Sequence, residues 1–116
     1  LKIPNLIILG HSNCGGVEYS YKKLLDKKNI NDFEYINEWT SCLQNSYNNI
    51  SNDLPETEKI TFFEQENIKQ SIKNLREYDF IDKLINENKL NVVGLWYQIN
   101  SGLIKFLDNN SFIDLD

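Results

Sequence analysis

An apolar run that ends in a glycine-rich polar loop is the feature that most constrains how this 116-residue chain can fold. Residues 5–10 read NLIILG, and residues 11–16 read HSNCGG before a helical pattern begins at Val17. A short continuous apolar run is typical of a strand buried on both faces of a parallel sheet. The order strand, polar loop, helix predicts that residues 11–16 lie at the carboxyl end of a strand in an α/β domain.

Apolar residues spaced by three or four predict helices along most of the remaining chain. The expected helices cover residues 17–26, residues 33–50, a segment opened by Pro55 that extends to Leu75, and residues 78–87. Residues 90–99 are strand-like, and residues 103–107 can return as the second strand of a hairpin that ends at residues 108–110. The predicted fold class is therefore α/β: a central, mainly parallel sheet flanked by helices, with a C-terminal β-hairpin, in a single domain over residues 1–116.

The composition excludes several classes of protein. The net charge of −5 argues against nucleic-acid binding, which needs clustered Lys and Arg. No apolar run approaches the roughly 20 residues that a membrane span requires. The two cysteines are too few for a disulfide framework, so a reducing compartment, the cytoplasm, is the default location.

The start of the chain predicts that the domain is incomplete. The sequence contains no Met, and an apolar strand begins at Asn5 after almost no polar lead-in. An opening strand with no neighbour before it implies that further strands of the sheet are missing. We therefore expect residues 1–116 to be a fragment, and any N-terminal targeting signal to lie in the missing part.

The polar loop contains the residues most suited to chemistry. His11 and Cys14 combine an imidazole and a thiol, ligands that together suit zinc, and two intervening residues let both side chains turn toward one point. Gly15 and Gly16 allow close approach of the backbone, and the N-terminus of the following helix favours a thiolate. The spacing alone leaves two other interpretations open: a buried Cys beside a capping His, and a thiol nucleophile at Cys14 with His11 as its base.

Longer motifs narrow these interpretations through a family resemblance. Residues 7–17, IILGHSNCGGV, resemble the second zinc motif of β-class carbonic anhydrases, G-H-S-x-C-G-G. Residues 67–75, NIKQSIKNL, resemble that family's N-V-x-x-S-x-x-N-L helix, and residues 94–102, GLWYQINSG, resemble its G-W-x-Y-x-I-x-x-G hairpin, with Leu95 where the family usually has Trp. Trp39 falls where the family often has a Trp, so the resemblance covers the chain from Ile7 to Asp108.

The resemblance implies a function and a set of site residues. The family hydrates carbon dioxide reversibly to bicarbonate and a proton, by attack of a zinc-bound hydroxide. His11 and Cys14 match two of the three zinc ligands, and Gly15 and Gly16 match the residues that support the metal loop. Tyr97 matches a Tyr that helps to hold bicarbonate in one subgroup; the alternative is an ordinary core residue of a strand. Members form homodimers or larger homo-oligomers with the pocket at the subunit interface.

One departure from the family limits this prediction. The third ligand belongs to an upstream C-x-D-x-R motif, whose Asp and Arg form a dyad beside the zinc-bound water, and no such motif occurs here. No catalytic residue is therefore assigned within the chain, which alone should bind zinc weakly and be inactive. Cys42, followed by Leu-Gln-Asn, is either a substitute ligand or, as we favour, a structural thiol.

Two further functions agree with the same residues. A metal-free relative that serves as an interaction domain would also lack C-x-D-x-R. Another zinc hydrolase on this fold, such as a carbon disulfide hydrolase, would have the same metal loop. Among the polar helix residues, Asn67 and Ser71 are expected to be buried anchors between helices, and Glu18 and Glu64 are expected to be solvated.

Overall fold

The computed structural model describes residues 2–26 and 34–115, and within them the chain divides into two compact units. One unit consists of residues 1–12 and 68–116, and the other of residues 13–67. The single domain over residues 1–116 stays a prediction, and the two units are described separately below. None of the helices in the described ranges is both long enough and apolar enough to cross a lipid bilayer.

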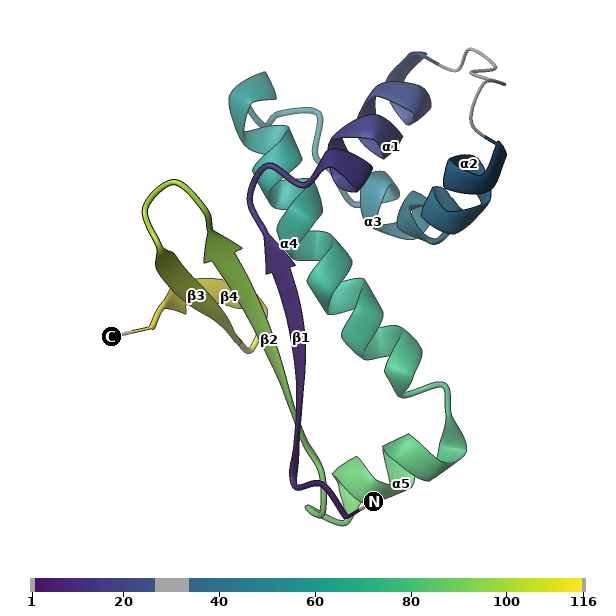
Figure 1. The fold of residues 1–116 in the computed structure, drawn as a ribbon, viewed down its shortest axis with the longest axis vertical. Helices are drawn as coiled ribbons and strands as arrows, with labels where there is room; N and C mark the ends of the chain where they lie inside the picture. Colours follow the sequence, from purple (N-terminus) through teal and green to yellow (C-terminus); the bar gives the residue numbers. More distant parts are fainter. Residues whose placement is uncertain (1, 27–33, 116) are drawn as a thin grey trace. The chain divides into compact units, whose positions relative to one another are not determined.

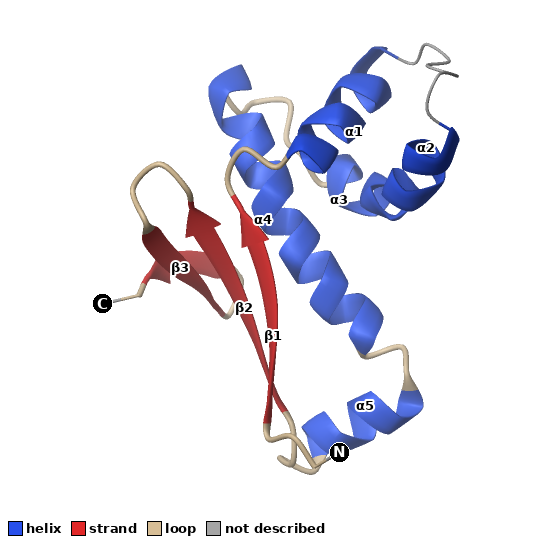
Figure 2. Cartoon of the chain, viewed as in Figure 1, coloured by secondary structure: helices blue, strands red, loops and turns tan. Residues whose placement is uncertain are grey.

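A four-stranded sheet forms the unit of residues 1–12 and 68–116 (Figures 1 and 2). Its strands are β1 (Asn5–His11), β2 (Asn91–Gln98), β3 (Leu103–Asp108) and β4 (Ser111–Asp114), in that spatial order. β1 pairs with β2 in parallel, whereas β2–β3 and β3–β4 are antiparallel. The α/β class and the C-terminal hairpin are thus confirmed, while the sheet within the described residues is mixed, so parallel pairing does not predominate there.

Turn chemistry explains why the chain adds a fourth strand after residues 108–110. Asn109 has a φ of 54°, and Asn is one of the few residues other than Gly that adopts this left-handed conformation readily. The two-residue turn Asn109–Asn110 therefore folds β4 back onto β3, where the sequence predicted only the end of a strand. Gly102, with a φ of 71°, closes the turn between β2 and β3.

One helix end packs closely on this sheet because β2 carries a glycine. α4 (Glu56–Leu75) contributes Ile68 and Ile72, which lie 3.0 and 3.1 Å from where a Cβ on Gly94 would be. α5 (Asp79–Asn86) follows and ends in a Schellman-type turn, in which Lys89 N–H donates to the Leu84 carbonyl at 2.9 Å. The absence of a side chain at position 94 thus sets the distance between α4 and the sheet.

The burial of β1 differs from the sequence prediction. We expected this strand to be buried on both faces, but exposed and half-buried residues alternate along it. Ile7 and Leu9 are 58% and 63% exposed, whereas Leu6 and Ile8 are half-buried. The reason is that the described residues cover only one face of this strand.

The described part of the unit of residues 13–67 is helical. Its elements are α1 (Gly15–Asp26), α2 (Glu34–Thr40), a 3₁₀ turn η1 (Ser41–Leu43), α3 (Gln44–Asn48) and the first part of α4. Val17, Tyr21, Leu43 and Phe63 form its buried core, with Cys14, Tyr47, Ile50 and Ile60 packed against it. The rings of Tyr21, Tyr47 and Phe63 contact one another, with centroids 5.9–6.4 Å apart.

The helix expected over residues 33–50 is interrupted, and Phe33 lies outside the described residues. Thr40 Oγ1 donates to the Ile36 carbonyl and Ser41 Oγ to the Glu38 carbonyl, both at 2.7 Å. Such bonds offer helix carbonyls an alternative partner, and here they coincide with the change to 3₁₀ geometry at Ser41. Trp39, predicted to face the core, is 73% exposed.

Candidate metal centre

His11 is the last residue of β1, and its side chain has a defined hydrogen bond. Its Nδ1 lies 2.9 Å from the backbone carbonyl oxygen of Ser12, where an Nδ1–H group donates. In a neutral imidazole this leaves the lone pair on Nε2, the arrangement that metal-binding histidines usually have. The His11 side chain is exposed, so nothing in its burial prevents Nε2 from binding a metal.

Ser12, which the sequence analysis did not single out, holds the end of β1 in place. It is 9% exposed; its N–H donates to the Tyr97 carbonyl, and its Oγ accepts from the N–H of Ile99, both at 2.9 Å. These bonds tie the start of the loop to the end of β2. Because the Ser12 carbonyl is also the partner of His11 Nδ1, a fixed Ser12 restricts the orientation of the imidazole. Asn13 follows with a φ of 56°, a left-handed conformation that Asn tolerates.

Cys14 precedes α1 and is held through its backbone. Its carbonyl accepts the N–H of Glu18 at 2.9 Å, and its own N–H donates to Glu64 Oε1 at 3.1 Å. Glu64 is only 4% exposed, so our expectation that it is a solvated carboxylate was wrong. The signal was present in the sequence, because Glu64 lies on the same helical stripe as Ile60 and Ile68. The thiol of Cys14 is free and half-buried.

The two loop glycines differ in what surrounds them. A Cβ on Gly16 would lie 3.2 Å from Cζ3 of Trp39, whereas a Cβ on Gly15 would have no atom within 4 Å. Gly16 therefore has a steric reason to be glycine, since it lets the Trp39 ring lie against α1. The structure shows no such reason at Gly15.

The second cysteine, Cys42, lies in η1 and is exposed. Its Sγ is 3.4 Å from the Trp39 carbonyl, a contact within its own turn. Cys42 and Cys14 both line a small pocket of about 140 Å³ beside Trp39 and Asn67. Asn67 is half-buried, as is Ser71 further along α4, and both have interaction partners.

Tyr97 lies opposite His11 in the register of β1 and β2. Its side chain is 37% exposed, which does not agree with the core position that we considered as the alternative to bicarbonate binding. No group of three or more His, Cys, Asp or Glu side chains that could hold a metal occurs in residues 2–26 and 34–115. The described residues thus provide two of the expected ligands and no complete set.

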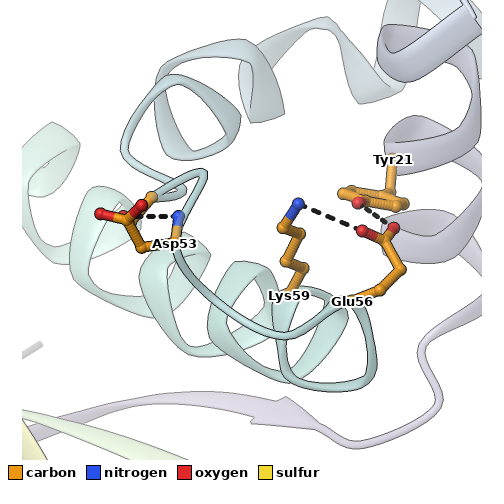
Figure 3. A network of polar contacts seen from close by, with 5 residues as sticks. Tyr21, Asp53, Glu56 and Lys59 are labelled. Atoms are coloured by element: carbon orange, nitrogen blue, oxygen red, sulfur yellow. Dashed lines mark hydrogen bonds and ion pairs between the residues drawn. The ribbon is translucent and has the colours of Figure 1, made fainter.

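A polar network joins α1 to the start of α4 (Figure 3). Tyr21 Oη donates to Glu56 Oε1 at 2.5 Å, and Lys59 Nζ lies 3.1 Å from Glu56 Oε2. Burial, and then the bond to Glu56, raise the pKa of Tyr21 to about 12. The same bond, together with Lys59, lowers the pKa of Glu56.

This network predicts a pH-dependent stability. The folded state holds the Tyr21 proton more tightly than the unfolded state does. The contribution of this proton to the free energy of unfolding is therefore fully present below pH 10, and it is lost as the pH rises toward the folded pKa of about 12. We expect the wild type to lose about 2 kcal/mol of unfolding free energy over this pH range. Tyr21→Phe should not show this loss, and the substitution itself should cost about 1 kcal/mol at pH 7. Urea unfolding at pH 7, 10 and 11.5 measures both effects.

Tyr35→Phe is the matched control, because Tyr35 is 86% exposed. Its stability should follow that of the wild type at each pH. If Tyr21→Phe and the wild type lost stability in parallel above pH 10, ionisation of Tyr21 would not be the cause of the loss.

Comparison with known proteins assigns the family. The family model described as carbonic anhydrase matches residues 1–104. Beta carbonic anhydrase 3 of Arabidopsis thaliana is 28% identical over 105 residues, which cover 88% of this chain and 40% of that protein. A carbonic anhydrase of Helicobacter pylori is 31% identical over 108 residues, which cover 88% of this chain and 48% of that protein.

Solved structures agree with these matches. A tetrameric β-carbonic anhydrase from Sordaria macrospora has a TM-score of 0.74 and 25% identity, covering 99% of this chain and 55% of that one. The fold and the motif-bearing loop thus define a carbonic anhydrase domain. The chain belongs to the β-carbonic anhydrase family, as its motifs predicted, and it spans about half the length of the curated relatives it matches.

Proposed function

We propose that this protein acts in the zinc-dependent, reversible hydration of carbon dioxide to bicarbonate and a proton, with His11 and Cys14 as two of the zinc ligands. Family membership supports the reaction. The observation that carries the assignment of ligands is the bond between His11 Nδ1 and the Ser12 carbonyl, which leaves Nε2 for a metal at the start of the His-x-x-Cys loop. Zinc would lower the pKa of a water molecule toward 7 and so supply a nucleophile at neutral pH.

The chain's own residues have separate tasks in this proposal. Ser12 fixes the imidazole through its carbonyl, and Glu64 fixes the backbone of Cys14, whose thiol binds zinc as the thiolate. Gly15 and Gly16 form the start of α1 directly after the ligand loop. Tyr97, partly exposed at the end of β2, is the proposed contact for bicarbonate.

The remaining parts of the site must come from outside the described residues. Two protein ligands fall short of the three that catalytic zinc sites usually have, and no third candidate joins them in the described ranges. We therefore place a further Cys, and an Asp–Arg pair that orients the reacting water, beyond this chain. The tetrameric relative supports a homodimer or larger homo-oligomer. The cytoplasm is the proposed location, because two cysteines are too few for a disulfide framework.

The proposal predicts different behaviour for the chain and for the protein expressed from its natural coding sequence. The isolated 116-residue chain should bind zinc weakly and show no carbon dioxide hydration, because one ligand and the Asp–Arg pair are absent. The product of the natural coding sequence should contain one zinc per chain and hydrate carbon dioxide. Metal analysis, competition with a chromophoric chelator and stopped-flow hydration assays measure these properties.

Three results would contradict this account in different ways. Full hydration activity of the isolated chain would show that the site is complete within it. A protein that folds and never takes up zinc would indicate an interaction domain without metal. Zinc-dependent hydrolysis of carbon disulfide without hydration of carbon dioxide would indicate another hydrolase on the same fold.

A further inference from the structure

Both cysteines of the chain line the same small pocket in the unit of residues 13–67. The pocket has a volume of about 140 Å³, and Trp39 and Asn67 also line it. One water molecule takes up about 30 Å³ in the liquid, so this space holds only a few of them. Cys14 and Cys42 therefore border one narrow space, although they belong to different helical segments.

Packing beside the pocket holds the two cysteine-bearing segments together. The Trp39 ring lies against Gly16, where an added Cβ would be 3.2 Å from Cζ3. Val17 and Leu43 belong to one buried cluster, and Cys14 packs against that cluster. Each cysteine is thus within three residues of a contact that joins its own segment to the other.

The two thiols differ in accessibility. Both are free, but Cys42 is exposed whereas Cys14 is half-buried. Cys42 lies in η1, a short 3₁₀ turn, and the hydrogen-bond geometry of a 3₁₀ helix is poorer than that of an α-helix. A disulfide requires Cα atoms about 4.4–6.8 Å apart, and a 3₁₀ turn adjusts to that distance more readily than a regular helix does.

We infer that Cys14 and Cys42 form a reversible disulfide with each other, and that this bond withdraws Cys14 from zinc. The second part rests on the proposed function, in which Cys14 is a zinc ligand. Zinc binds cysteine as the thiolate, so a sulfur atom in a disulfide is no longer available as a ligand. In a reducing compartment such bonds are usually transient and report the redox state.

The co-reactant is a small disulfide such as oxidised glutathione. The Cys42 thiolate attacks one of its sulfur atoms, so its S–S bond breaks, a mixed disulfide forms and one glutathione thiolate leaves. The Cys14 thiolate then attacks the Cys42 sulfur and expels the second glutathione. Two protein thiols are thereby oxidised, one small disulfide is reduced to two thiols, and the protons of the protein thiols pass to the released glutathione.

Disulfide mapping of the protein expressed from its natural coding sequence tests the first part. Zinc is removed with a chelator, oxidised glutathione is added, the remaining thiols are alkylated, and trypsin digestion follows without reduction. Cleavage after lysine places Cys14 in residues 3–22 and Cys42 in residues 29–59, so their disulfide joins two identifiable peptides. The expected result is this linked pair, in a yield that does not depend on protein concentration.

Competition with a chromophoric chelator tests the second part. The oxidised protein should bind zinc about a hundredfold or more weakly than the reduced protein, and dithiothreitol should restore the affinity. Saturating zinc should slow formation of the disulfide about tenfold or more, because only the metal-free thiolate reacts. Cys42→Ser is the matched control: it lacks the exposed thiol that reacts first, so the same treatment should leave its zinc affinity within about twofold.

The outcomes separate this inference from the proposed function. Absence of the linked peptides, or linkage of Cys14 to a different thiol, overturns the inference and leaves the zinc site as proposed. Equal losses of zinc affinity in the wild type and in Cys42→Ser also overturn it, because Cys42 is then not the partner. A disulfide between Cys14 and Cys42 that leaves the zinc affinity unchanged supports the thiol pair, and contradicts Cys14 as a ligand and so the link to zinc.

Discussion

Replacing Cys14 by serine is expected to weaken zinc binding about a hundredfold or more in the protein expressed from its natural coding sequence. A full set of four protein ligands gives a zinc affinity of about 10–16 kcal/mol, so one ligand corresponds to about 2.5–4 kcal/mol. Cys14 is the only thiol in the loop after β1, and its backbone is already fixed by Glu64, so serine removes the ligand and leaves the loop in place. Competition with a chromophoric chelator measures the zinc affinity.

Cys42→Ser is the matched control for this experiment. Cys42 is exposed in η1 and its sulfur contacts the carbonyl of Trp39, so its loss should change the zinc affinity less than twofold. Equal losses in the two variants would mean that Cys42 is also a ligand. An unchanged affinity in Cys14→Ser would remove Cys14 from the proposed site.

Replacing Phe63 by alanine is expected to cost about 3–5 kcal/mol of unfolding free energy. Phe63 is 0% exposed and contacts the rings of Tyr21 and Tyr47, in the core against which Cys14 packs. A loss of this size approaches the whole stability of a small domain, which is about 5–15 kcal/mol. Urea unfolding followed by circular dichroism measures it.

Two further variants keep this prediction testable. Phe80→Ala removes a ring that is 67% exposed and should cost less than about 1 kcal/mol. Phe63→Leu keeps most of the buried volume and should remain folded, with a loss of about 1–1.5 kcal/mol. If Phe63→Ala lost no more unfolding free energy than Phe80→Ala, the core of residues 13–67 would not depend on Phe63.

The order of elements was predictable because local patterns determine it. The apolar run before Gly10 and the periodicity of residues 17–26 predicted β1 and α1 almost to the residue. The hairpin of β2 and β3 followed from a polar turn between two strand-like segments. β4 was missed because Asn109 and Asn110 were interpreted as the end of a strand, whereas a left-handed Asn can also form a tight turn.

Burial was less predictable, because it depends on neighbours that local patterns do not identify. The apolar run of β1 predicted two buried faces, and the structure covers one. Trp39 continued an apolar stripe in sequence, but the helix gives way to 3₁₀ geometry at Ser41 and the ring is exposed. Glu64 was interpreted as solvated because it is charged, although its position on the helix predicted burial.

The proposed metal ligands come from a motif and not from geometry. His11 and Cys14 lie close in sequence, and the hydrogen bond that fixes the His11 tautomer depends on a neighbouring carbonyl, which any sequence supplies. The supporting residues Ser12 and Glu64 act through the backbone, so their side-chain types alone do not reveal the role. The described residues contain no group of three candidate ligands, so a third ligand stays a prediction.

Stopped-flow measurement of carbon dioxide hydration, on zinc-loaded protein from the natural coding sequence, tests the central claim most directly. The account predicts hydration that depends on zinc, disappears on metal removal, returns on zinc addition, and is lost in His11→Ala as well as in Cys14→Ser. Zinc-replete, folded protein without hydration would contradict the proposed function, and full activity in both variants would contradict the proposed ligands.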